Sequence, residues 1–373
     1  MDALMLPLNW QRVRLGDIGK PCMCKRVMKH QTTRYGEIPF YKIGTFGNTA
    51  DAFISKKLFL EYKTKYSFPK KGDILISASG TIGRAVIYDG KPAYFQDSNI
   101  VWIDNDETLV KNDFLFYVYS NVKWNTEYTT ILRLYNDNFR NTLIPLPPLN
   151  EQSAIANILS GLDRYLCALD ALILKKEGVK KALSFELLSQ RKRLKGFNQA
   201  WQRVRLGDIA NYLISNLSAE QITQQGKIKV YDVNNFIGYT DTTFISDKPY
   251  ISIVKDGSVG RVRILPPKTN ILSTMGALIA NHRTTTEFLF YLLSNFDFKN
   301  FTSGNIIPHI YFKDYKEKTI FLPPLNEQST IANILSALDN EIASLKNKKR
   351  QFENIKKALN HDLMSAKIRV LKK

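Results

Sequence analysis

The sequence predicts an α+β fold with an internal pseudo-two-fold repeat, in which two mixed globules are each followed by a long helix of coiled-coil type. The first observation behind this prediction is the nonapeptide Trp-Gln-Arg-Val-Arg-Leu-Gly-Asp-Ile, which occurs at 10–18 and, unchanged, at 201–209. The second is the segment 146–189, which recurs as 322–365 with 24 of its 44 positions identical. The third is the apolar spacing within that segment, which follows three- and four-residue steps.

The duplication divides the 373 residues into two copies, near 1–196 and 197–373. A repeat unit of this length is a whole domain plus a helix, not one layer of a solenoid. The length alone also predicts two or three domains. We therefore place the first globule with its nonapeptide at 1–149, a central long helix at 150–196, the second globule with its nonapeptide at 197–325 and a C-terminal long helix at 326–373.

The two recurring segments are predicted to be long helices. Prolines at 147–148 and 323–324 prevent a helix from starting earlier, and Asn150 and Asn326 are suitable N-caps. At about 1.5 Å per residue, each helix would reach roughly 66 Å. The apolar positions form a narrow stripe that is expected to pack against the stripe of the other copy. These positions are Ile155, Leu159, Leu162, Leu166, Leu169, Ile173, Val179, Leu183 and Leu187, and then Ile331, Leu335, Leu338, Ile342, Leu345, Phe352, Ile355, Leu359 and Leu363.

The variable regions between these landmarks are predicted to be α+β globules. Short alternating runs at 73–77 and 84–88 predict two strands around a glycine turn at 79–83. One helix is predicted in each globule, at 113–121 and at 287–295.

The two globules are related but have diverged. Gly80-Thr-Ile-Gly-Arg-Ala-Val-Ile aligns with Gly257-Ser-Val-Gly-Arg-Val-Arg-Ile, and Phe53-Ile-Ser aligns with Phe244-Ile-Ser. The segment starting at Ile38 aligns with the one starting at Ile228, and the rest differs. A common frame with two diverged globules is what a protein with two different targets would need.

Composition favours a polyanionic partner. Lys and Arg total 53 against 34 Asp and Glu, a net charge of +19, which favours nucleic acid, although a soluble basic surface is the alternative. No apolar run reaches the 18 or more residues of a membrane span, and the start of the chain lacks the basic region of a secretory signal. Three cysteines, an odd and sparse number, argue against a disulfide framework and for a reducing cytoplasm.

The sequence lacks the recognised signatures of catalysis. It contains no phosphate-binding loop, no Gly-x-Gly-x-x-Gly, no His-Glu-x-x-His and no Asn/Asp-Pro-Pro-Tyr/Phe tetrapeptide of adenine methyltransferases. Cys22-Met-Cys24 is too closely spaced for a zinc pair. Asp51, Glu61 and Lys63 faintly resemble a nuclease set, but the second copy has no counterpart. We expect neither an active site nor a metal or cofactor in this chain, the rival being a nuclease or methyltransferase with unrecognised motifs.

These motifs together resemble one family, the specificity (S) subunits of type I restriction–modification systems. The resemblance covers nearly the whole chain. It rests on the Trp-containing nonapeptide before each globule, on Gly-Asp-Ile-Leu-Ile-Ser-Ala-Ser-Gly-Thr-Ile-Gly at 72–83, and on Leu-Pro-Pro-Leu-Asn-Glu-Gln before each long helix. The second glycine turn departs from the pattern, because Ile253-Val-Lys-Asp replaces the apolar and small residues.

The resemblance implies a DNA sequence-recognition subunit without an active site. Each globule would be a target recognition domain that reads one half of a bipartite, asymmetric site in double-stranded DNA. The helices would pair antiparallel and hold the globules apart. Two DNA methyltransferase (modification) subunits carrying S-adenosylmethionine would dock on the repeated motifs, and two restriction (translocase) subunits using ATP and Mg can join them in a bacterial or archaeal cytoplasm. The rival is a stand-alone bivalent DNA-binding or protein-scaffold module without a restriction partner.

Candidate DNA contacts are expected around the glycine turns. Arg84 and Arg261 follow the turns at equivalent positions, and arginine bonds phosphate or guanine bidentately. Each candidate has an alternative role as a turn former or surface residue. The candidates in the first globule are Lys42, Thr81, Arg84, Gln96, Asn99, Arg133, Tyr135 and Asn138, and those in the second, by internal alignment, are Lys229, Ser258, Arg261, Thr274, Tyr311 and Asp314.

Candidate contacts to the modification subunits come from the duplicated motifs, because duplicated surfaces suit two identical partners. The alternative for the leucines is that they staple their own helices. The candidates are Trp10, Leu149, Asn150, Glu151 and Gln152, with Trp201, Leu325, Asn326, Glu327 and Gln328 in the second copy.

Overall fold

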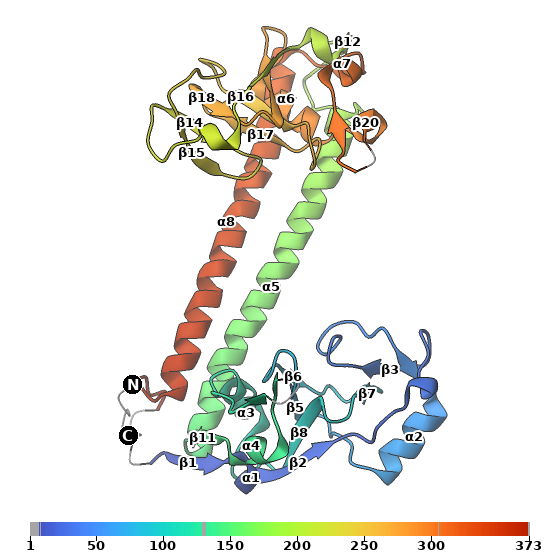
Figure 1. The fold of residues 1–373 in the computed structure, drawn as a ribbon, viewed down its shortest axis with the longest axis vertical. Helices are drawn as coiled ribbons and strands as arrows, with labels where there is room; N and C mark the ends of the chain where they lie inside the picture. Colours follow the sequence, from blue (N-terminus) through green and yellow to red (C-terminus); the bar gives the residue numbers. More distant parts are fainter. Residues whose placement is uncertain (1–6, 8, 129–131, 305, 372–373) are drawn as a thin grey trace. The chain divides into compact units, whose positions relative to one another are not determined.

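The protein is described by a computed structural model that covers residues 7, 9–128, 132–304 and 306–371. Most of the N-terminal segment on which the secretory-signal expectation rests therefore lies outside the described residues. The chain divides into two compact units, residues 1–169 with 348–373 and residues 170–347. Each unit contains one α+β part, which we call the first head (residues 11–146) and the second head (residues 202–322), together with stretches of both long helices (Figure 1).

The first head is built on two small sheets. The strand order is β2-β8-β5-β6 in the four-stranded sheet, which is antiparallel, and β4-β3-β7 in the three-stranded sheet, where β3 and β7 are parallel. The predicted strand pair around the glycine turn is confirmed as β5 and β6. The strands are β2 (Gly19–Met23), β3 (Ile38–Tyr41), β4 (Phe53–Ile54), β5 (Ile74–Ser77), β6 (Ala85–Ile87), β7 (Tyr94–Phe95) and β8 (Ile100–Asn105).

Short elements complete the first head. The nonapeptide forms β1, which pairs with β11 just before the long helix, and then the single turn α1. The predicted helix is confirmed as α3. These elements are β1 (Gln11–Arg14), α1 (Leu15–Ile18), η1 (Lys29–Gln31), α2 (Lys56–Lys65), α3 (Asn112–Tyr119), β9 (Glu127–Tyr128), β10 (Leu132–Arg133), α4 (Asn136–Asn141) and β11 (Leu143–Leu146).

The second head repeats this topology strand for strand. Its sheets have the orders β13-β19-β16-β17 and β15-β14-β18. Its elements are β12 (Gln202–Arg205), η2 (Leu206–Asp208), β13 (Ala210–Ile214), η3 (Ala219–Gln221), β14 (Ile228–Tyr231), β15 (Phe236–Thr240), β16 (Tyr250–Val254), β17 (Val262–Leu265), β18 (Thr269–Ile271), β19 (Met275–Ala280), α6 (Thr286–Ser294), η4 (Lys299–Phe301), β20 (Thr302–Ser303), β21 (His309–Ile310), α7 (Phe312–Tyr315) and β22 (Thr319–Leu322). The predicted internal repeat is therefore confirmed in three dimensions.

The heads differ between the third and fifth strands of each copy. The first head inserts α2 there, whereas the fully described connection 241–249 of the second head contains no helix. The alignment of Phe53 with Phe244 was wrong. Phe53 bridges Thr33, and the matching bridge joins Thr223 to Tyr239, so Tyr239 takes the place of Phe53. A shared Phe-Ile-Ser tripeptide could not show this, because its second occurrence lies in the connection 241–249 and not in the strand that matches β4.

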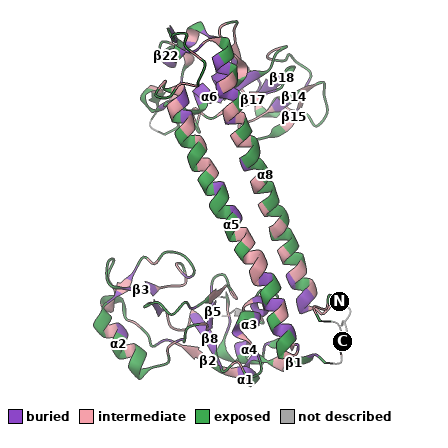
Figure 2. Ribbon diagram, turned by 180° about the vertical axis from the view of Figure 1, so that it is seen from behind, coloured by how far each residue is buried: buried purple, intermediate pink, exposed green. Residues whose placement is uncertain are grey.

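Strand β5 is buried on both faces, which explains its continuous apolar run. Ile74 and Ile76 point into a core that contains Phe114 of α3. Leu75 points the other way, into a second core with Trp102. This alternation follows from the two-residue period of a strand. Figure 2 shows the buried residues gathered in the sheets and in the helix segments that lie beside them.

The long helices are α5 (Leu149–Leu188) and α8 (Leu325–Met364), each 40 residues and therefore about 60 Å long. Asn150 and Asn326 are not the N-caps. The carbonyls of Pro148 and Pro324 already accept helical bonds, and each asparagine lies one residue inside the helix. Its Oδ1 instead accepts a bond from the next backbone N–H, at 2.9 Å in both copies.

Within each unit the two helices run antiparallel. In the first unit, Tyr165 of α5 contacts Phe352 of α8, with ring centroids 4.7 Å apart. Most of the predicted stripe is buried or half-buried, but Val179 and Ile355 are exposed. The lysine that follows each of them forms an ion pair with the other long helix instead. Lys180 pairs with Asp339, and Lys356 pairs with Asp163.

Candidate nucleic-acid interface and its supporting frame

Each head is fixed to its long helix by a Trp–Glu–Arg cluster. In the first, Trp10 Nε1 donates to Glu151 Oε2 at 3.1 Å, and Arg369, just past the end of α8, binds both oxygens of the same carboxylate at 2.7 and 3.0 Å. This hydrogen bond raises the pKa of Arg369. Glu151 is only 2% exposed, so the bidentate arginine and the indole N–H compensate a buried negative charge.

The second cluster repeats the first. Trp201 Nε1 donates to Glu327 Oε2 at 3.0 Å, and Arg193, just past the end of α5, bonds both oxygens at 2.7 and 3.3 Å. The cluster explains why the tryptophan of the nonapeptide and the glutamate of Asn-Glu-Gln occur together in both copies.

The glutamine of the same motif is fully buried and saturated with hydrogen bonds. Gln152 accepts from the Lys111 N–H and donates to the carbonyls of Leu109 and Pro147. Gln328 makes the matching bonds to the segment 283–285 and to Pro323. Each glutamine thus ties the start of a long helix to the start of the helix in its head.

A Tyr–Asp–Lys set joins each head helix to both long helices. Tyr117 of α3 donates to Asp163 Oδ2 at 2.8 Å, Lys356 of α8 pairs with the other oxygen, and its Nζ lies 5.6 Å from the centroid of the Tyr117 ring. In the second unit Tyr291 donates to Asp339 at 2.9 Å, with Lys180 as the cation. Burial and the neighbouring carboxylate raise the pKa of both tyrosines, so both hydroxyls keep their protons.

These contacts change the interpretation of the candidate partner residues. Trp10, Glu151, Gln152, Trp201, Glu327 and Gln328 are buried within their own units, where they hold heads to helices. A side chain enclosed in this way presents no surface to a second protein. The four candidates that remain exposed are Leu149, Asn150, Leu325 and Asn326.

The glycine turn of the first head gathers several of the candidate DNA contacts. Arg133 of β10 donates to the Ser98 carbonyl at 2.7 Å and to Asn99 Oδ1 at 3.3 Å, and Asn99 also accepts from the Ser79 hydroxyl at 2.8 Å. The Ala78 carbonyl accepts from the Leu134 N–H, which fastens the β9–β10 hairpin to the turn. The hairpin and the turn therefore form one continuous surface.

The remaining candidates of the first head lie around this surface. Thr81 and Arg84 are exposed on the turn, and Arg84 Nη2 reaches Asn48 Oδ1 at 3.4 Å. Gln96 Oε1 accepts from the Ile43 N–H at 3.0 Å and so holds the loop that carries Lys42, whose Nζ pairs with Asp51 at 2.8 Å. Two further candidates lie just beyond the hairpin, where Tyr135 is exposed before α4 and Asn138 is half-buried within it.

The second head makes the same backbone contacts with different side chains. Arg261 follows the glycine turn at 256–260 and donates to Asn234 Oδ1 at 2.8 Å, as Arg84 does toward Asn48. Ser258 and Thr274 are exposed on or beside the turn. Tyr311 is exposed just before α7, and Asp314 is exposed within it.

Lys229 is exposed in the middle of β14, and the strand register places Asp232 at the position of Lys42, as the alignment of the segments that start at Ile38 and Ile228 predicts. His309 was missed. The bridge between Ser79 and Arg133 in the first head is matched by a bridge between Asp256 and His309, so His309 takes the place of Arg133. Its Nδ1 lies 2.7 Å from Asp256 Oδ1. Only the pairing of the strands reveals this, because the sequences around the two residues differ.

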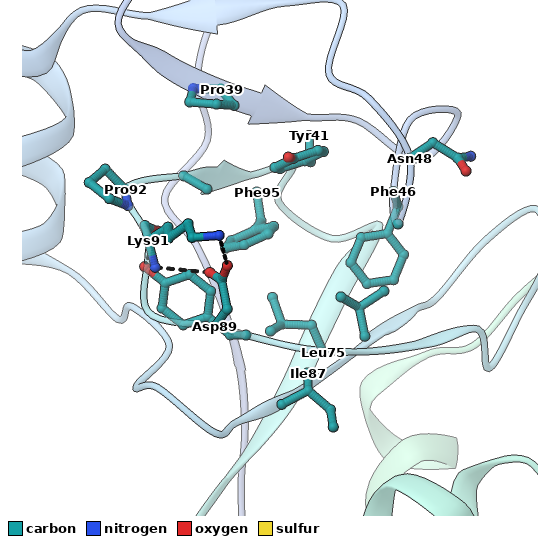
Figure 3. A pocket seen from close by; sticks show the side chains of 14 residues that line it. Pro39, Tyr41, Phe46, Asn48, Leu75, Ile87, Asp89, Lys91, Pro92 and Phe95 are labelled. Atoms are coloured by element: carbon teal, nitrogen blue, oxygen red, sulfur yellow. Dashed lines mark hydrogen bonds and ion pairs between the residues drawn. The ribbon is translucent and has the colours of Figure 1, made fainter. Parts of the chain in front are cut away.

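The first head contains a cavity of about 400 Å³ between its two sheets, lined by the aromatic side chains of Tyr41, Phe46 and Phe95 (Figure 3). In the second head, Arg263 takes the position of Val86 in this lining. Its guanidinium lies 5.3 Å from the centroid of the Tyr231 ring and donates to the Asn234 carbonyl at 2.9 Å. The space between the sheets is thus filled by different side chains in the two heads.

Among the residues that the structure describes, no group of three or more His, Cys, Asp or Glu is placed to hold a metal ion. No described helix is long and apolar enough to span a membrane.

The fold and the site define a duplicated two-headed protein whose heads share a backbone but differ in the side chains around an exposed glycine turn. A family model described as the type I restriction modification DNA specificity domain matches residues 7–176 and 198–354. These matches cover most of the chain, so the chain belongs to this family. Its resemblance to the specificity subunits is thereby confirmed.

Individual proteins that are similar to this chain are described as type I specificity subunits. A protein of Haemophilus influenzae described as a type I restriction enzyme specificity subunit is 64% identical over 148 residues, which are 39% of this chain and 38% of that protein. The MjaVIII specificity subunit of Methanocaldococcus jannaschii is 25% identical over 414 residues, covering 99% of this chain and 95% of that one. The crystal structure of a type I S subunit from M. genitalium shares the fold, with a TM-score of 0.63 at 20% identity over 96% of this chain and 98% of that chain.

Proposed function

We propose that this chain is the DNA-recognition subunit of a type I restriction–modification complex, in which each head reads one half of a bipartite, asymmetric site. One observation carries the proposal. Two heads of identical topology present the same hydrogen-bonded turn and hairpin, but Ser79 and Arg133 in one are replaced by Asp256 and His309 in the other. Different side chains on one backbone are what the reading of two different base sequences requires, because base edges are distinguished by donor and acceptor pattern.

The charge of the chain supports contact with the DNA backbone. A net charge of +19 is available to attract phosphates, which position a protein on the duplex without reading its sequence. Arg84 and Arg261, both exposed beside the turns, are the proposed anchors.

We propose that two methyltransferase subunits dock at the starts of α5 and α8. Leu149 and Leu325 are 41% and 48% exposed at matching places, beside Asn150 and Asn326. Two identical methyltransferase subunits could therefore bind the same exposed Leu-Asn pair at the start of each long helix. The chain itself would be non-catalytic and cytoplasmic, with S-adenosylmethionine on the modification subunits and ATP and Mg on restriction subunits that can join.

The docking proposal is tested with Leu149→Asp combined with Leu325→Asp. Because both leucines are exposed, the variant should keep the far-UV circular dichroism of the wild type while losing co-purification of the methyltransferase. Glu186→Ala, a change of an exposed ion pair at the far end of α5, is the matched control. A folded double variant that still binds two methyltransferases contradicts the proposal.

DNA recognition is tested by methylome sequencing of cells that carry this chain and its methyltransferase. The methylated motif should be bipartite, and purified chain should transfer no methyl group from S-adenosylmethionine and cut no DNA when tested alone. The rival, a bivalent protein scaffold that does not touch DNA, predicts no gel shift at any salt concentration. Phosphate contacts instead predict a shift that weakens steeply as salt rises.

A further inference from the structure

Two adjacent exposed isoleucines of the second head lie next to its glycine turn. Ile306 is 94% exposed and the adjacent Ile307 is 54% exposed, and both lie between β20 and β21. Tyr311, beyond β21, is 50% exposed. Two neighbouring branched aliphatic side chains in water are unfavourable unless another surface covers them.

The segment that carries these isoleucines is hydrogen-bonded to the glycine turn at 256–260. The Gly257 N–H donates to the Pro308 carbonyl and the Ile310 N–H to the Lys255 carbonyl, both at 2.9 Å. His309, directly after Pro308, is held by Asp256 at 2.7 Å. The segment directly after the isoleucines is therefore hydrogen-bonded to the turn that carries Ser258 and Arg261.

The backbone beside them is tightly fitted. Gly304 has a φ of +92°, and a Cβ there would lie 2.3 Å from the Ile307 carbonyl oxygen and 3.0 Å from the His309 ring. Only glycine fits such a position without strain.

We propose that Ile306 and Ile307 form an apolar wedge that enters the second half-site between adjacent base pairs. The proposal rests on the proposed function and adds a mode of reading to it. Aliphatic side chains that partly unstack a base step recur in DNA-binding proteins, where basic groups beside them hold the phosphates. Here Arg261 follows the same turn, and beyond β21 the Nζ of Lys313 lies 5.5 Å from the centroid of the Tyr311 ring.

The wedge predicts a preference that hydrogen bonds to bases do not give. Flexible pyrimidine–purine steps unstack more easily than others, so the second half-site should contain such a step opposite the isoleucines. The preference would come from the deformability of the DNA rather than from a base edge.

The test uses the complex of the full chain with its methyltransferase and a duplex of its methylated motif. 2-Aminopurine is placed in turn at each position of the second half-site except the methylated adenine, so that unstacking by the wedge is seen separately from the chemistry. With the wild-type chain, the fluorescence of 2-aminopurine should rise only at the base-pair step that the isoleucines enter. Ile306→Ala with Ile307→Ala should abolish the rise and weaken binding at least tenfold, and leucine at both positions should restore both signals.

Ile214→Ala is the matched control, because Ile214 is 58% exposed in β13 of the same head. It should leave fluorescence and affinity unchanged. If Arg261→Ala weakens binding while the double alanine variant does not, the wedge is wrong and the proposed function stands. If neither change affects binding, both fail. A double alanine variant that loses the methyltransferase but binds DNA normally would mark a protein surface and overturn the wedge.

Discussion

The two heads share their hydrogen-bonded backbone and differ where their side chains reach the surface. In both heads an arginine follows the glycine turn, and a hairpin bonds to that turn through matching backbone groups. Ser79 becomes Asp256, Arg133 becomes His309 and Val86 becomes Arg263. The side chains around the turn therefore differ between the heads without disturbing the sheets, because the strands that carry them keep their register.

By contrast, the groups that attach each head to the long helices have the same residues in both units. The Trp–Glu–Arg cluster, the buried glutamine and the Tyr–Asp–Lys set are repeated residue for residue in both units. Each of these groups is buried or half-buried and fully paired, so that a single change leaves an unpaired polar partner.

The largest effect should come from exchanging a whole head. Replacing 19–145 with the same region of another family member should change one half of the methylated motif and leave the other half as it was. Each altered base pair costs roughly 1–3 kcal/mol in binding free energy, so a half-site of several pairs should change completely. Methylome sequencing reads both halves at once, and a transplant that altered both would end the view of the heads as separate modules.

The next effect should come from the buried carboxylates. Glu151→Ala and Glu327→Ala each remove the partner of a bidentate arginine and of an indole N–H, and each should lower the free energy of unfolding by about 3 kcal/mol. Amide hydrogen exchange should locate the loss in the first unit for Glu151 and in the second for Glu327. Glu353→Ala, which breaks an exposed pair with Lys349, is the control and should cost well under 1 kcal/mol. Unequal losses in the two units would show that the repeated frames are not equivalent.

A smaller effect is expected for the two turn arginines. Arg84→Ala and Arg261→Ala should each weaken DNA binding by about 1–3 kcal/mol if the arginine contacts a base, with lost discrimination at one position of its own half-site. If the contact is to phosphate, the salt dependence should instead become shallower and discrimination should stay. Titrations with duplexes altered in one half-site at a time separate these outcomes. A loss of discrimination in both half-sites from one variant would argue against the division of labour.

The smallest effect should come from the tyrosine hydroxyls. Tyr117→Phe and Tyr291→Phe each remove one hydrogen bond to an aspartate that keeps its lysine partner, so each should cost about 1 kcal/mol and lower Tm by about 2–4 °C. Calorimetry of the two variants and of their combination would measure this. A double variant far less stable than the sum of the two single changes would reveal coupling between the units.

The features of the fold that repeat in the sequence could be predicted from it. The duplicated nonapeptide, the three- and four-residue spacing and the glycine turn gave the long helices, the β5–β6 pair and the repeat. The spacing placed Val179 and Ile355 on the buried stripe, although ion pairs of Lys180 and Lys356 take that place. Hydrophobic periodicity does not report an ion pair that is formed between distant segments.

The candidate site was predicted less well than the fold. The turn residues Thr81 and Arg84 lie where expected, since a local motif fixes them. His309 was missed, because its equivalence with Arg133 depends on strand pairing rather than on the neighbouring residues in the sequence. Because Trp10 and Glu151 recur as Trp201 and Glu327, the sequence suggested that these residues bind partner subunits. Their burial within each unit explains the same recurrence.

The position of Arg369 has a consequence for how the protein is made. The second unit is one continuous stretch, 170–347, whereas the first joins 1–169 to 348–373. A ribosome delivers the chain from its N-terminus, and domains generally fold as they emerge. Here the first head leaves the ribosome early but lacks Lys356 and Arg369 until the whole of the second unit has been made. We expect the second head to mature first, and the first head to remain exposed to chaperones and proteases until residues 348–373 arrive.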